Sequence, residues 1–182
     1  MKSLTLKDKY LKIIPELKKT LGVDNVMALP KLVKVVVSVG TGKNRDKKRL
    51  ELVADRLAKI TGQKPAPKQA KKSIATFKLR QGEVIGFAVT LRGKRMFDFL
   101  AKLLNVAIPR TRDFKGLDVK AVDEIGNITI GIKENTIFPE TTDEELKDVF
   151  GLAVTIVTTA KDKKAATALF TLLDFPFKKI AK

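Results

Sequence analysis

The stretch LVKVVVSV, residues 32–39, has the pattern of a β-strand with two different faces. β-Branched valines favour extended backbone, and successive side chains of a strand point to opposite sides. One face is apolar and carries Val33, Val35, Val37 and Val39, and the other carries Lys34, Val36, Ser38 and Gly40. The apolar face needs a covering layer, whereas the opposite face is composed for exposure.

The same two-faced pattern recurs at residues 84–92, 126–133 and 152–159, and a further strand is predicted over 73–79, joined to 84–92 through Gln81-Gly82. Apolar residues at helical spacing predict helices over 4–21, 44–61, 94–107 and 162–174. We therefore predict an α+β fold and a single domain over 1–182. Its antiparallel sheet would have helices packed on one face and an open, concave face left for a ligand.

The open face predicts contact with RNA. Its small and polar positions supply cations, hydroxyls, an amide and close backbone approach, at Lys34, Ser38, Gly40, Thr90, Arg92, Asn127 and Thr129. Such groups suit phosphates and ribose 2′-hydroxyls. The face lacks the aromatic pair on which bases stack in RNA-recognition motifs. An ordinary solvated face would show the same pattern. The choice between a solvated face and an RNA-binding face therefore depends on the composition of the chain.

Charge favours a polyanionic partner. The 182 residues include 37 basic and 20 acidic side chains, and the whole net charge of +17 lies in residues 1–95. The excess peaks around a predicted basic loop, residues 62–72, at Lys64, Lys68, Lys71, Lys72, Lys78 and Arg80. Because these cations repel one another and prolines disfavour regular structure, we predict that residues 64–80 are mobile until RNA orders them. An acidic segment, residues 138–150, predicts a second and different partner, a protein.

Composition also argues against catalysis. The chain has neither histidine nor cysteine, which removes the commonest general base and metal ligand and all thiol chemistry. Gly40-Thr-Gly-Lys-Asn44 lacks the spacing of a phosphate-binding loop, although its amides could hold one RNA phosphate. No carboxylate has a nucleophile or metal-ligand partner at a spacing typical of a catalytic or metal site. No apolar segment has the length of a membrane span. We predict no catalytic residue, metal or cofactor, and a cytoplasmic location.

Eight stretches in a fixed order also resemble a known family: TGQKP (61–65), AKKSIATFKLRQGEVIG (70–86), VTLRG (89–93), IPRTRDFKGL (108–117), GNITIGIKE (126–134), IFPE (137–140), VTTA (157–160) and DFPF (174–177). Together they resemble the L-five family of bacterial large-subunit ribosomal proteins, from about residue 4 to residue 179. Ser38, Ile128 and Asn135 depart from its usual Asn, aromatic residue and Gln. The shorter Ser38 puts one expected RNA hydrogen bond in doubt.

The resemblance implies a structural protein of the ribosome that anchors 5S rRNA in the central protuberance. Its implied partners are 5S rRNA, 23S rRNA, P-site tRNA at the basic loop, neighbouring large-subunit proteins and a small-subunit head protein. The implied bridge to the small subunit involves Arg110, Arg112, Glu140, Asp143, Glu144 and Glu145. Two alternatives stay open at this point: an RNA-binding or RNA-processing protein off the ribosome, and a membrane-surface protein.

Overall fold

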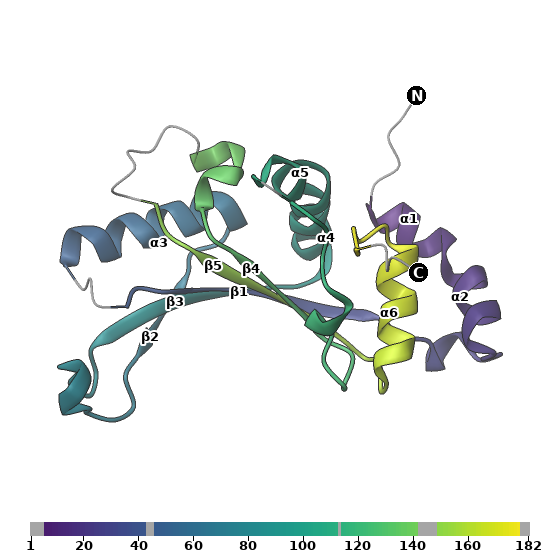
Figure 1. The fold of residues 1–182 in the computed structure, drawn as a ribbon, viewed down its shortest axis with the longest axis horizontal. Coiled ribbons are helices and arrows are strands. Elements are labelled where there is room, and N and C mark those ends of the chain that lie inside the picture. Colours follow the sequence, from purple (N-terminus) through teal and green to yellow (C-terminus); the bar gives the residue numbers. More distant parts are fainter. Residues whose placement is uncertain (1–5, 43–45, 113, 142–148, 179–182) are drawn as a thin grey trace. The chain divides into compact units, whose positions relative to one another are not determined.

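The computed structural model describes residues 6–42, 46–112, 114–141 and 149–178. The helices are α1 (Leu6–Lys12), α2 (Ile14–Leu21), α3 (Lys47–Thr61), α4 (Gly93–Lys102), α5 (Ile108–Arg110) and α6 (Lys163–Leu172). The strands are β1 (Leu32–Gly40), β2 (Ala66–Gln69), β3 (Val84–Leu91), β4 (Ile128–Ile132) and β5 (Leu152–Thr158). They form one antiparallel sheet in the order β2-β3-β1-β5-β4 (Figure 1). The predicted α+β class is confirmed.

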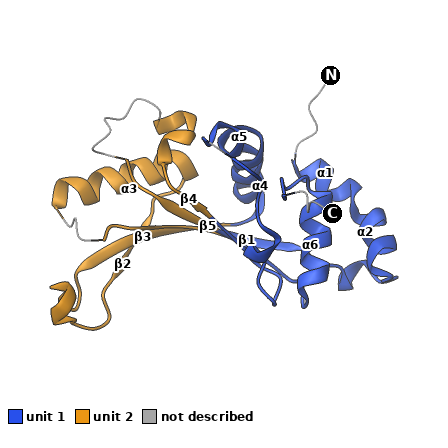
Figure 2. Cartoon of the chain, in the orientation of Figure 1, with its two compact units in different colours: residues 1–35, 92–130, 155–182 blue, residues 36–91, 131–154 orange. Residues whose placement is uncertain are grey.

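Two compact units make up the chain, and Figure 2 colours them separately. Unit 1 contains residues 1–35, 92–130 and 155–182, and unit 2 contains residues 36–91 and 131–154. Strands β1, β4 and β5 contribute residues to both. The single domain over 1–182 stays a prediction.

In unit 2, helix α3 packs on β3 and covers the apolar strand face. The side chains of Val37, Val39, Val89 and Leu91 are almost wholly buried, as are Val53, Leu57 and Ile60 of α3. Each fully buried aliphatic side chain contributes about 1.5–3 kcal/mol relative to an exposed one. The alternation predicted from the valines of β1 is thus the basis of this core.

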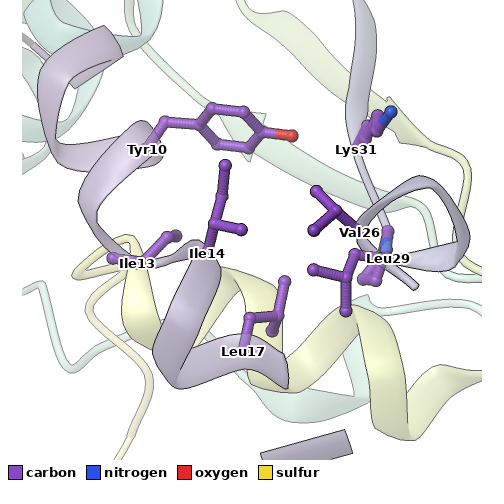
Figure 3. A pocket seen from close by; sticks show the side chains of 8 residues that line it. Tyr10, Ile13, Ile14, Leu17, Val26, Leu29 and Lys31 are labelled. Carbon is purple, nitrogen blue, oxygen red and sulfur yellow. The ribbon is translucent and has the colours of Figure 1, made fainter. Parts of the chain in front are cut away.

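Unit 1 has its own core, in which the helices cover the other ends of the strands. Val35, Ile128, Ile130 and Ile156 are buried from the sheet, and Met96, Leu100, Leu169 and Phe170 are buried from α4 and α6. A cavity of about 20 Å³ lies beside α1 and α2, with the side chains of Tyr10, Ile14 and Val26 turned toward it (Figure 3). Burial raises the pKa of the Tyr10 hydroxyl, so that group is neutral at physiological pH.

The predicted strand over 73–79 is wrong. Residues Ala75–Phe77 form a 3₁₀ turn, and only an isolated bridge joins Ile74 to Leu79. The strand paired with β3 is instead β2, inside the predicted basic loop 62–72, with Pro67 opposite Phe87. Proline is tolerated there because β2 is at the edge of the sheet, where one row of N–H groups has no ladder partner.

The predicted helix over 4–21 is two helices, α1 and α2. Pro15 has no N–H to continue the hydrogen-bond ladder, so the helix is interrupted at Ile13. The predicted helix over 94–107 is confirmed as α4, continued by a π-helical turn at Leu103–Ala107. The start of the helix predicted over 44–61 and residues 4–5 lie outside the described residues.

Candidate nucleic-acid interface

The uncovered strand face of unit 1 carries two of the predicted cations. Lys34 is half-buried on β1, and Arg92 is exposed directly after β3. Arg92 keeps an extended backbone, with φ −139° and ψ 163°, so it continues the alternation of β3 before α4 begins. A strand face can therefore present both cations to a ligand without help from a loop.

Two polar residues of β4 and its entry differ in what they offer. Thr129 is exposed, and its Oγ1 lies 3.1 Å from Oγ1 of Thr155 on β5. Asn127 is engaged within the protein: its Oδ1 accepts a hydrogen bond from the Thr158 N–H at 3.1 Å, and its Nδ2 donates to Asp123 at 3.1 Å. The amide of Asn127 thus holds strand ends together, a function that its sequence position did not reveal.

In unit 2 the predicted face residues are small. Ser38 is half-buried on β1, and Gly40 and Thr90 are exposed. Gly86, on the predicted open face of β3, is buried because it lies against the backbone of β1, where an added Cβ would overlap the Val39 carbonyl oxygen. The glycine thus allows the backbones of β3 and β1 to approach closely, whereas the sequence predicts a close approach by RNA.

The cationic hairpin, residues 64–83 of unit 2, presents all six predicted cations on its surface. Lys64, Lys68, Lys71, Lys72, Lys78 and Arg80 are each exposed. Its end is tied by backbone hydrogen bonds from Ala70 N to Glu83 O at 2.8 Å and between Ile74 and Leu79 at 3.0 and 3.1 Å. These bonds give the hairpin a defined geometry; its mobility in solution stays a prediction.

The tip of the cationic hairpin is apolar, which sequence reasoning missed. Phe77 is 64% exposed and Ile74 is 43% exposed. The sequence predicts a strand for both residues, and alternation along a strand would bury one of them. Their position between prolines and the Gln81-Gly82 turn was the signal for a loop end. An exposed aromatic ring among cations is suited to stacking on a base or ribose.

Comparison with known proteins decides the family. Residues 25–80 match the family model described as Ribosomal protein L5, and residues 84–177 match the model of the C-terminus of the same ribosomal family. The chain is 49% identical over 177 residues to a protein of Desulfatibacillum aliphaticivorans, covering 96% of this chain and 99% of that one. It is 47% identical over 176 residues to a protein of Thermotoga sp. (strain RQ2), covering 96% of each. Both are named large ribosomal subunit protein uL5.

The chain belongs to the ribosomal protein L5 family. Membership of the L5 family makes it a structural constituent of the large ribosomal subunit and not an enzyme, as predicted from the sequence. The predicted location in the ribosome, in the cytoplasm, agrees with this family. The described part of the chain holds no cluster of side chains fit for a metal ion, and none of its helices is long and apolar enough to span a membrane.

The L5-family residues predicted for the subunit bridge are only partly described. Arg110 and Arg112 are exposed in unit 1, and Glu140 is exposed in unit 2. Asp143, Glu144 and Glu145 lie outside the described residues. Because the two arginines and Glu140 belong to different units, their grouping into one surface stays a prediction.

A buried polar clamp in unit 2 joins Asn135, which precedes the acidic segment, to residues near both ends of that segment. Asn135 is fully buried, and its Oδ1 accepts a hydrogen bond from the Phe150 N–H at 3.1 Å. The hydroxyl of Thr141 donates to the carbonyl of Asn135 at 2.7 Å. Asn135, which replaces the expected Gln, thus fixes residue 150 close to residue 135.

Proposed function

We propose that this chain binds 5S rRNA and helps to anchor it in the central protuberance of the large subunit. The observation that carries the proposal is the composition of the uncovered strand faces. In unit 1 they offer Lys34, Arg92 and Thr129, and in unit 2 they offer Ser38, Gly40 and Thr90. Cations and hydroxyls without an aromatic platform suit backbone and 2′-hydroxyl recognition of a structured RNA. Asn127 supports this surface indirectly, by holding β4 to β5.

The test is direct binding of the purified full chain to 5S rRNA. We expect tighter binding to 5S rRNA than to a transcript of equal length and scrambled sequence, with a steep loss of affinity as salt rises. Fluorescence anisotropy over a salt series measures both quantities. Equal affinity for the two RNAs would instead favour the alternative, a general RNA-binding protein off the ribosome.

We further propose that the cationic hairpin contacts P-site tRNA, while neighbouring surfaces contact 23S rRNA and adjacent large-subunit proteins. Lysines are flexible point charges suited to a sugar–phosphate backbone whose sequence varies from one tRNA to another. Phe77 adds an exposed aromatic face at the tip of the hairpin. This pairing of charge and ring suits an RNA whose backbone is constant in shape and whose bases are accessible.

Replacing Lys68, Lys71 and Lys72 together by alanine is expected to speed tRNA dissociation from the P site at least about tenfold, because at least one phosphate contact is lost. Binding of 5S rRNA should stay at the wild-type value. The matched control replaces three exposed lysines of α1 and α2, Lys7, Lys12 and Lys19. Unchanged tRNA dissociation together with a collapse of 5S binding would assign the hairpin to the 5S site.

We also propose that the acidic segment 138–150 contributes to a bridge with a small-subunit head protein, since phosphates would repel it. The double variant Glu144→Lys, Glu145→Lys should weaken subunit association about tenfold and leave 5S binding unchanged. Light scattering of mixed subunits measures association, with Glu124→Lys as a control at an exposed acid of unit 1. A fall in 5S affinity with no change in subunit association would contradict the bridge.

A further inference from the structure

A groove in unit 1 is not used by any of the surfaces above. It has a volume of about 680 Å³ and is bounded by the end of α2, the 3₁₀ turn at Val119–Ala121 and the outer side of α6. Helices α2 and α6 pack against each other beside it. Thr20, Val119, Ala168 and Leu172 line it, and none of these side chains is fully buried.

The groove has few polar groups to offer a ligand. Its three threonine hydroxyls all donate hydrogen bonds to carbonyls one turn back in their own helices: Thr20 to Glu16 at 2.9 Å, Thr167 to Lys163 at 2.8 Å and Thr171 to Thr167 at 2.8 Å. Their methyl groups, with Val119, Ala168 and Leu172, make an apolar lining. Because these hydroxyls already donate within the protein, this part of the groove fits an apolar ligand better than RNA.

Positive charge stands at one end of this apolar lining. Lys163 and Lys164 line the groove in the first turn of α6, which contains no acidic residue. Asp162 is the acid next to them in the chain, but neither lysine has an ion-pair partner in the part of the chain that the structure describes. The positive end of the helix dipole lies at the same place, so this end favours an anion.

We propose that this groove binds an acidic amphipathic segment of another protein of the large subunit. Its carboxylates would meet Lys163 and Lys164, and its aliphatic side chains would pack on Ala168 and Leu172. Eight residues of helix separate Lys164 from Leu172, a rise of about 12 Å. The bound segment must therefore carry aliphatic anchors about 6 and about 12 Å from its acidic residues. This surface is separate from the proposed 5S and tRNA contacts.

The experiment places the photo-crosslinking residue benzoylphenylalanine at Thr171, in full-length protein assembled into large subunits. We expect cross-links to one protein segment with aliphatic and acidic residues, identified by mass spectrometry. Benzoylphenylalanine at Asn105, which is exposed elsewhere in unit 1, is the control for random capture. Cross-links to rRNA, to a segment without acidic residues, or to nothing would overturn the proposal.

Charge reversal provides the second arm. Lys163→Glu with Lys164→Glu should lower the cross-link yield at position 171 about tenfold, because like charges then meet across the groove. Acids in the first turn of α6 complement the helix dipole, so the variant should fold with an unchanged or higher Tm. Lys7→Glu, at an exposed lysine in the first turn of α1 that does not line the groove, is the control. An unchanged yield in a folded Lys163/Lys164 variant would overturn the charge pairing on which the proposal rests.

Discussion

Replacing Gly86 by alanine is expected to destabilise the protein by about 3 kcal/mol, because the added methyl group has no room. An added Cβ would overlap the Val39 carbonyl oxygen and would also press on the Cα of Gly40. Both are backbone atoms of β1, so no side chain can rotate away. Relief would require β1 and β3 to move apart in the centre of the sheet. Thermal unfolding should show a fall in Tm of about 6–12 °C for a chain of this size.

Gly131 provides a matched control, since it is also a strand glycine of unit 2. It lies on the edge strand β4, is exposed, and an added Cβ would meet nothing within 4 Å. Gly131→Ala should be neutral or stabilise by about 0.4–1 kcal/mol, because alanine reduces the freedom of the unfolded chain. Equal Tm changes in the two variants would show that the sheet accommodates a side chain at position 86.

The core strands could be predicted from sequence because their pattern is local. The valines at 33, 35, 37 and 39 and the isoleucines at 128 and 130 recur at every second position, and burial follows that alternation over most of each strand. Val33 and Ile85 are exceptions, at 41% and 37% exposure. Each is the second residue of its strand.

The errors arose where a residue's position depends on partners far along the chain. β2 consists of alanine, proline, lysine and glutamine, all exposed, and is a strand only because β3 pairs with it. Residues 73–79 alternate like a strand but form the end of a hairpin, which the pairing of Ala70 with Glu83 sets. The amide of Asn127 is on the predicted RNA-binding face, but its oxygen accepts a hydrogen bond from the N–H of Thr158, which is distant in sequence.

The proposed RNA-binding surface could be named residue by residue for a related reason. Successive side chains of a strand point to opposite faces, so the alternation that identifies the buried residues also identifies the residues of the exposed face. Lys34, Thr90 and Thr129 could be predicted in this way. Arg92 continues the same alternation one residue beyond the end of β3. The alternation does not show which of these groups has a hydrogen-bond partner inside the protein. Asn127 differs from the others because both ends of its amide are engaged within the protein.

The variant with Lys34→Ala and Arg92→Ala is expected to bind 5S rRNA about a hundredfold more weakly at low salt, roughly tenfold for each lost phosphate contact. Both residues belong to unit 1 and lie on strand faces that the helices leave uncovered. The slope of log affinity against log salt should become shallower by about one for each residue, because each cation releases fewer counterions on binding. Anisotropy titrations over a series of salt concentrations give both values.

Two controls make the result specific to these positions. Arg92→Lys keeps the charge but loses the planar fork of donors, so it should retain the salt slope and lose part of the affinity. Lys120→Ala removes an exposed cation of unit 1 that is off the strand faces, and should change neither quantity beyond a small electrostatic effect. If the double variant keeps wild-type affinity and slope while folding normally, 5S rRNA does not bind this face. The cationic hairpin would then be the next surface to test, since it carries five exposed lysines.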